Sequence, residues 1–170
     1  MAGPATSLLR LALAAIATGL AGLAGAQDYT VYAAGDIAWC DHPDPKWSGA
    51  AATARVVETG LAASQDAAVL LLGDITYPRG TLREFTECYH PTWGRFKDRT
   101  WPSPGNHEYL TPGARGYFDY FGSAAGRGYY RIKLGSWQVY SLDSNLGPGP
   151  AAVQLAWLKQ ELAGNPSHCT

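Results

Sequence analysis

The sequence predicts an α/β fold with mixed sheets, and three observations carry this prediction. Short apolar segments alternate with helical segments, polar residues come directly after several of the apolar segments, and no repeat or interdomain linker divides the chain. Hydrophobic residues make up 46% of the 170 residues and charged residues 16%. This composition supplies a core and excludes a highly charged, disordered chain.

The N-terminal segment has the pattern of a secretory signal peptide. Arg10 is the only charge in residues 1–26, residues 11–23 are apolar, and Ala24-Gly25-Ala26 fits the small-residue cleavage pattern. The alternative is an uncleaved membrane anchor, since a span needs about 20 apolar residues and residues 7–26 almost reach that length. We expect cleavage, which leaves residues 27–170 as one domain of a secreted or periplasmic protein without a stable membrane span.

Three cysteines allow three single disulfide pairings. We favour Cys40 with Cys88, because each follows a Gly-Asp turn and both turns are expected at the same edge of one sheet. Cys169 is then unpaired, which indicates a partner outside this chain. Export makes such a disulfide possible, because oxidised cysteines persist in secreted proteins.

The first half of the domain is predicted to contain a strand, a helix and a second strand. Residues 29–35 are apolar and partly β-branched, as in a buried strand. Ser48 is expected to cap a helix over about residues 49–62, with Val57 and Leu61 on its apolar face. Residues 67–72 form a continuous apolar run, which predicts a strand covered on both faces.

The second half is predicted to contain shorter elements before a final helix. In chain order they are a helical stretch (82–89), a helical turn (93–96), an extended piece (100–103), a short helix (116–120) and an antiparallel hairpin (128–134 and 136–142). Pro148-Gly149-Pro150 is expected to break the chain. An amphipathic helix over residues 151–163 then presents Leu155, Leu158 and Leu162 on one face.

Polar residues follow the predicted strands in a regular way. Asp36 follows the first, Asp74 the second, residues 106–108 the extended piece and residues 143–145 the hairpin. Ligand sites of open α/β sheets form at the carboxyl ends of strands, so these side chains are expected at one rim. Oxygen and imidazole donors suit divalent or trivalent metals, and two such metals can polarise a phosphoryl group and convert bound water to hydroxide.

The order and spacing of three short motifs are more specific than any one of them. Gly35-Asp36, then Gly73-Asp74-Ile75-Thr76-Tyr77, then Gly105-Asn106-His107-Glu108 resembles the calcineurin-like metallophosphoesterase superfamily, in particular its purple acid phosphatase branch. The resemblance runs from about Tyr29 to the end of the chain. It implies the N-terminal part of an αββα four-layer sandwich and a dinuclear metal centre that hydrolyses phosphoesters.

The resemblance also implies a role for each matching residue. Asp36 is the implied carboxylate ligand of the first metal, Asp74 the carboxylate that bridges the two metals, and Tyr77 the phenolate ligand. Asn106 is the implied amide ligand of the second metal, and His107 is the implied catalytic acid. Ala38 stands where the wider superfamily places a histidine ligand, and a phenolate from Tyr77 accounts for that difference. The implied metals are Fe(III) with Zn, Mn or Fe(II). Glu108 receives no separate role.

Later histidine motifs of the family, Val-x-x-His or His-His-Pro and then Gly-His-x-His, are missing from the sequence. Its histidines are His42, His90, His107 and His168. We expect His42 and His90 on the surface or behind the ligands, and His168 in a connector. The missing histidine motifs favour a C-terminal truncation. We therefore expect weak metal binding and little or no phosphatase activity for the chain alone.

Three alternatives to a phosphomonoesterase remain open. The chain could be a non-catalytic secreted binding module that keeps the fold, a phosphodiesterase of the same superfamily, or a disulfide-bonded structural protein. A small phosphoester is the expected partner. A net charge of −1 gives no indication of a nucleic-acid surface. The oligomeric state stays open.

Overall fold

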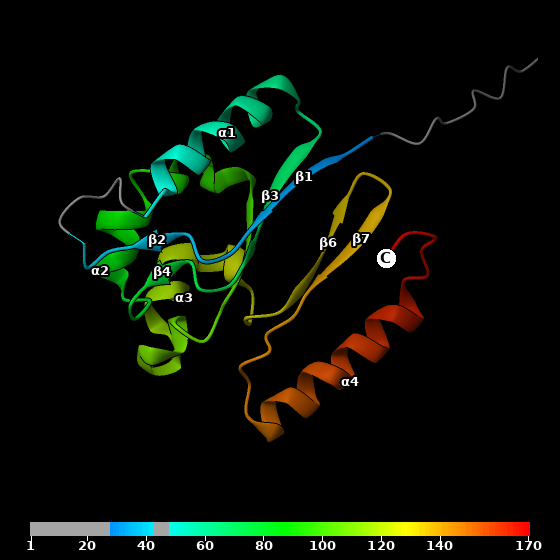
Figure 1. The fold of residues 1–170 in the computed structure, drawn as a ribbon. Coiled ribbons are helices and arrows are strands. Elements are labelled where there is room, and N and C mark those ends of the chain that lie inside the picture. The colour runs from blue at the N-terminus through cyan, green and yellow to red at the C-terminus, as the bar shows by residue number, and fades with distance from the viewer. Residues whose placement is uncertain (1–27, 43–47) are drawn as a thin grey trace, which may run out of the picture.

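The computed structural model describes residues 28–42 and 48–170 and has a mixed α/β architecture. Figure 1 shows helix α1 (Ala50–Ala63) along one side of strands β1 (Thr30–Ala34) and β3 (Ala67–Leu72). The hairpin of β6 (Tyr130–Leu134) and β7 (Trp137–Ser141) lies on the other side, and helix α4 (Pro148–Gly164) lies beyond the hairpin. The coarse fold class predicted from the sequence is therefore confirmed. The predicted signal peptide lies outside the described residues, and no helix within the described ranges is long and apolar enough to cross a membrane.

A three-stranded parallel sheet forms the centre of the fold. Its order is β1 (Thr30–Ala34), β3 (Ala67–Leu72) and β5 (Thr100–Ser103), and all three strands run in the same direction. The predicted bounds of β3 and β5 are confirmed. Because parallel strands end at the same edge, the segments that follow them are brought together there.

Helix α1 (Ala50–Ala63) covers one face of this sheet. Its buried residues recur at a helical spacing, Ala50, Ala54, Val57 and Leu61. The prediction for the start of the helix is one residue off. Gly49 occupies the N-cap position at φ 73°, and the Ser48 Oγ accepts a hydrogen bond of 3.3 Å from the Ala50 N–H.

The opposite face of the sheet is only partly covered, so the prediction that β3 is covered on both faces is wrong. Strands β6 (Tyr130–Leu134) and β7 (Trp137–Ser141) form the predicted antiparallel hairpin beside it. The Tyr130 hydroxyl donates to the Pro102 carbonyl at 2.7 Å, which ties the hairpin to β5. A hollow of about 270 Å³ separates the hairpin from β3, and Leu72 is 64% exposed.

Helix α4 (Pro148–Gly164) corrects two predictions. Pro148 does not break the chain but begins the helix, because the first helical position needs no N–H partner and proline already has a helical φ. The three leucines also do not form one packed face. Trp157 packs on Tyr129 with ring centroids 4.9 Å apart and Leu158 is half-buried, whereas Leu155 and Leu162 are 51% and 44% exposed.

Short elements and an aromatic cluster complete the fold. They are, in chain order, β2 (Ala38–Trp39), β4 (Thr76–Tyr77), α2 (Leu82–Glu84), a π-helical turn (Phe85–Tyr89), 3-10 segments (Trp93–Arg99, Glu108–Leu110 and Pro112–Ala114), α3 (Arg115–Phe121) and a further 3-10 turn (Gly122–Ala125). Strands β2 and β4 pair in parallel. The buried aromatics around α3 stack edge to face in several pairs, a geometry that ring quadrupoles favour.

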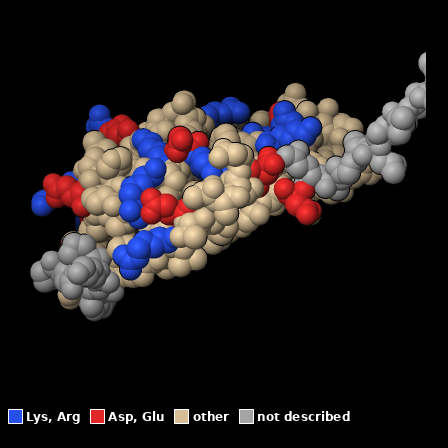
Figure 2. All heavy atoms as spheres, turned by 90° about the horizontal axis from the view of Figure 1, so that it is seen from above, with Lys and Arg blue, Asp and Glu red and all other residues tan. Residues whose placement is uncertain are grey.

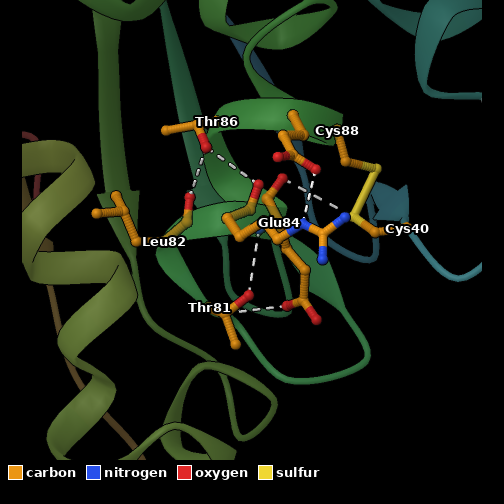
Figure 3. Close-up of polar contacts among 8 residues, drawn as sticks. Cys40, Thr81, Leu82, Glu84, Thr86 and Cys88 are labelled. Carbon is orange, nitrogen blue, oxygen red and sulfur yellow. Dashed lines mark hydrogen bonds and ion pairs between the residues drawn. A yellow bond between two sulfur atoms is a disulfide. The ribbon is translucent and has the colours of Figure 1, made fainter.

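The disulfide between Cys40 and Cys88 is confirmed. It joins the end of β2 to the π-helical turn, with the two Cα atoms 5.7 Å apart (Figure 3). A capping box precedes this turn, in which the Thr81 Oγ1 accepts from the Glu84 N–H at 3.2 Å and Glu84 Oε2 accepts from the Thr81 N–H at 2.9 Å. Cys169 is a free cysteine, as predicted.

Charged residues of both signs mix on the surface. On the face drawn in Figure 2, Lys and Arg side chains alternate with Asp and Glu instead of forming a patch of one sign. One such contact is the ion pair between Arg95 Nη2 and Glu58 Oε2 at 3.2 Å, which joins the 3-10 segment to α1. Exposed pairs of this kind add little to stability.

Arg99 has a different environment, because its guanidinium donates to backbone carbonyls at the C-terminal end of α1 and at the start of β3. The acceptors include the carbonyl oxygens of Leu61 and Ser64, each at 2.7 Å, and of Ala67 at 2.6 Å. The carbonyls of Leu61 and Ser64 have no helical partner, because α1 ends here, and a cation stabilises that end of a helix. The Ala67 carbonyl belongs to the start of β3. Arg99 therefore joins α1, β3 and β5.

We expect Arg99→Met to lower the free energy of unfolding by about 1.5–3 kcal/mol, the usual value of hydrogen bonds to a charged group. Urea unfolding followed by circular dichroism measures the change. Arg115→Met is the matched control, because its side chain is 82% exposed and lies 3.8 Å from Asp119. Equal stability of both variants would contradict this role of Arg99.

Candidate metal centre

The loops after β1 and β3 place two carboxylates at one edge of the sheet. Asp36 and Asp74 both have left-handed backbone conformations, with φ 54° and 48°, and the adjacent Gly73 has φ 90°. A Cβ on Gly73 would lie 2.7 Å from the Gly105 Cα, so the loops after β3 and β5 are in backbone contact. Strained left-handed residues are often retained at functional sites.

Asp36, Asp74 and Tyr77 meet through the phenol of Tyr77. The Tyr77 hydroxyl donates to Oδ1 of Asp36 and lies 3.2 Å from Oδ2 of Asp74. Burial, and then the hydrogen bond to Asp36, raise the pKa of this phenol above its ordinary value. The phenol proton therefore lies between two carboxylates, at a position where a cation would find three oxygen donors.

The β2–β4 ladder holds the Tyr77 ring in this position. The Cys40 N–H donates to the Tyr77 carbonyl at 3.0 Å, and the Trp39 ring stacks on the Tyr77 ring with centroids 5.2 Å apart. Tyr77 is followed by Pro78 through a cis peptide bond. The disulfide at Cys40 thus lies one residue beyond the aromatic ring that covers Tyr77.

His107 also packs against Tyr77, with ring centroids 4.2 Å apart. Its backbone N–H donates to Oδ1 of Asp74 at 2.9 Å, and its Nδ1 lies 2.7 Å from the Pro78 carbonyl oxygen. Because a carbonyl only accepts, Nδ1 carries the proton in this contact, which leaves Nε2 as the ring atom that can give or take one.

Asn106 shares a small polar pocket with the two carboxylates. The pocket has a volume of about 160 Å³, and its lining includes Asp36, Asp74 and Asn106. Asn106 is exposed, and neither Tyr77 nor His107 is part of this lining. The structure thus brings the Tyr77 hydroxyl into contact with Asp36 and Asp74, and it brings Asn106 to the pocket that these two carboxylates line.

Ser144 and Asn145 also line this pocket, and the sequence analysis assigned them no role. Asp143, which is 1% exposed, holds Asn145 there. Its carboxylate accepts the Asn145 N–H at 2.8 Å and the Tyr109 hydroxyl at 2.5 Å. The sequence signal for Ser144 and Asn145 was their position directly after the second hairpin strand, at the predicted rim of the sheet.

Glu108 is a third residue without a predicted role that lies against the site. Its side chain is fully buried and accepts hydrogen bonds from backbone N–H groups of both the Asp74 loop and the Gly105 loop. Burial raises the pKa of the Glu108 carboxyl, although these N–H donors oppose that change. Its place in the Gly105-Asn106-His107-Glu108 motif was the only sequence signal.

The remaining histidines lie elsewhere. His90 Nδ1 is 2.8 Å from the Tyr120 hydroxyl, His42 lines a hollow beside the disulfide, and His168 is exposed near the end of the chain. Within residues 28–42 and 48–170, no group of three or more His, Cys, Asp or Glu side chains is placed to hold a metal. A metal here therefore depends on the Tyr77 phenol and the Asn106 amide as well as on carboxylates.

The donor set fits one hard cation better than it fits two. The Tyr77 hydroxyl is within hydrogen-bonding distance of both carboxylates, and such oxygen donors suit Fe(III), Mn(II) and Mg(II). A second ion would have the shared carboxylate of Asp74 and the amide of Asn106. That is fewer than the four to six donors that these metals take.

Comparison with known proteins gives no further assignment: no protein-family model matches this sequence, and no curated protein matches it.

Proposed function

We propose that this protein is a secreted, metal-dependent phosphoester hydrolase, with its site at the pocket lined by Asp36, Asp74 and Asn106. The observation that carries the proposal is the meeting of Asp36, Asp74 and Tyr77, which come from the ends of two parallel strands and from β4. Mutually repelling carboxylates at one sheet edge have a simple explanation if a cation binds between them.

The arrangement of elements is also compatible with the sandwich that the motifs imply. In Figure 1, helix α1 lies next to the parallel sheet, the β6–β7 hairpin lies on the far side of the sheet, and α4 lies beyond the hairpin. An αββα sandwich of a calcineurin-like metallophosphoesterase would have this order of layers. We include this finer fold assignment in the proposal.

Each residue has a chemical role in this proposal. Asp36, Asp74 and Tyr77 would hold Fe(III), and Asn106 would reach a second ion, Zn(II), Mn(II) or Fe(II), shared through Asp74. Bound metal would supply Lewis-acid polarisation of the phosphoryl group and a hydroxide at neutral pH. The polar pocket beside these residues has room for a phosphate group.

His107 is suited to act as the general acid. The Pro78 carbonyl fixes the Nδ1 proton and the ring orientation, so Nε2 of a protonated ring is free to give a proton to the leaving alkoxide. A positioned acid of this kind accelerates a reaction by about 10²–10⁴. Asp74 holds the His107 backbone, so a single carboxylate ties the acid to the metal ligands.

The number of donors limits the expected activity. The four candidate ligands give three donors to the first ion and two to the second, which is too few for a complete dinuclear centre. We therefore expect this chain to bind about one cation and to hydrolyse phosphomonoesters weakly or not at all.

Two measurements on the purified protein test the proposal. Isothermal titration with Mn(II) or Zn(II) gives the stoichiometry, and p-nitrophenyl phosphate hydrolysis with added iron, zinc or manganese gives the turnover. A bis-p-nitrophenyl phosphate assay separates diester from monoester activity. Absence of cation binding would overturn the proposed function, whereas robust turnover would show that the donor set is complete.

A further inference from the structure

Glu108 connects the two loops that carry the candidate ligands. Its Oε2 accepts the Gly105 N–H at 2.7 Å and the Asp74 N–H at 3.0 Å, one donor from each loop. Its Oε1 accepts the Ile75 N–H at 2.9 Å and the Thr76 N–H at 3.3 Å. The side chain is 0% exposed, so one fully buried carboxylate satisfies four backbone donors.

The polar partners of Glu108 are unusual for a buried carboxylate. Such groups are normally paired with a basic side chain, but in the described part of the chain the hydrogen bonds to Glu108 come from backbone N–H groups. Loss of the carboxylate would leave four backbone donors, two of them buried and two half-buried, without this acceptor. The polar contacts of Glu108 are therefore with the two loops that carry the candidate ligands.

We propose that Glu108 is a positioning residue for the candidate metal centre. The inference rests on the proposed function, since it assigns Glu108 to the same site. By bonding the Asp74 N–H and the Gly105 N–H to one oxygen, Glu108 fixes the distance between the loop that carries Asp74 and the loop that carries Asn106 and His107. The His107 N–H then reaches Oδ1 of Asp74.

The close approach of the loops explains why such a connection is needed. A Cβ on Gly105 would lie 2.2 Å from both the Asp74 N and its Oδ1. Two backbone segments this close present several N–H dipoles to each other, and an anion between them compensates these dipoles. Metal ligands are commonly oriented by such outer hydrogen-bond partners, whose loss weakens metal affinity by about 10- to 100-fold.

The test is Glu108→Gln, which keeps the shape of the side chain but replaces one acceptor oxygen with an NH₂ donor. Thr100→Val is the matched control, because it removes a buried hydrogen bond of 2.9 Å, to the Phe96 carbonyl, at the opposite end of β5. Three quantities are measured for each protein: unfolding by urea, amide hydrogen exchange by NMR, and Zn(II) affinity by calorimetry.

We expect E108Q to speed amide exchange at one of two pairs of residues, Gly105 with Asp74 or Ile75 with Thr76, and to weaken Zn(II) binding by about 10- to 100-fold. In T100V, exchange at these four amides and the zinc affinity should stay unchanged, even if T100V loses as much stability as E108Q. Unchanged exchange at all four amides, or an equal loss of zinc affinity in T100V, overturns the positioning role. Wild-type protein that binds no zinc instead overturns the proposed function, and the amide exchange still decides whether Glu108 joins the loops.

Discussion

Asp74→Asn is expected to lower the affinity of the protein for Mn(II) or Zn(II) by about three orders of magnitude. The Asp74 carboxylate accepts hydrogen bonds from the Tyr77 hydroxyl and the His107 N–H, and it is the bridging group of the proposed centre. At an effective dielectric constant of 20, unit charges 4 Å apart attract by about 4 kcal/mol. Each 1.4 kcal/mol is tenfold in affinity, so loss of this charge corresponds to roughly a thousandfold. Calorimetric titration measures the effect.

Asp119→Asn provides the control for removal of one negative charge. Asp119 is an exposed residue of α3 that lies 3.8 Å from Arg115 and does not line the pocket. We expect the Asp119→Asn variant to bind the cation as tightly as the unmodified protein does. A similar loss of cation affinity in both variants would mean that the affinity depends on net charge alone, and this would contradict a site at Asp74.

Removal of the disulfide is expected to have the largest effect on stability. Cys40 and Cys88 are separated by 48 positions, and closing a loop of this length stabilises a folded chain by about 4 kcal/mol in the chain-entropy model. The double variant Cys40→Ala with Cys88→Ala should therefore lose about 4 kcal/mol in free energy of unfolding, measured by urea denaturation. This is a large part of the stability of a typical domain.

Two comparisons sharpen the disulfide prediction. Cys169→Ala removes the free thiol and should leave the denaturation midpoint unchanged. Addition of a reductant to the unmodified protein should reproduce the loss seen in the double variant. A double variant as stable as the unmodified protein would contradict a stabilising cross-link between β2 and the π-helical turn.

Local patterns in the sequence were sufficient for most of the elements. The apolar run that became β3 and the hairpin around Gly135 carry their own signals, in hydrophobicity and in turn residues. The errors arose where tertiary contacts decide. Trp157, and not the leucine row, packs against the hairpin, and no local pattern shows which face of α4 meets a neighbour.

In the candidate site, too, local motifs predicted some residues, whereas others depend on tertiary packing. Motif spacing identified Asp36, Asp74 and Tyr77, and the structure joins them by hydrogen bonds. The motif contains Glu108 but does not predict its role, because its partners are backbone groups that any sequence would supply. Asn145 comes from a segment distant in the chain, so its place in the pocket depends on the packing of the hairpin against β5.

The most direct test of a metal site at Asp36, Asp74 and Tyr77 is the visible absorption spectrum of the protein loaded with Fe(III). A phenolate bound to Fe(III) gives a charge-transfer band, so the unmodified protein should become coloured. Tyr77→Phe should bind iron without this band, because it removes only the phenolic oxygen. A band that persists in Y77F, or none in the unmodified protein after iron loading, would contradict the account.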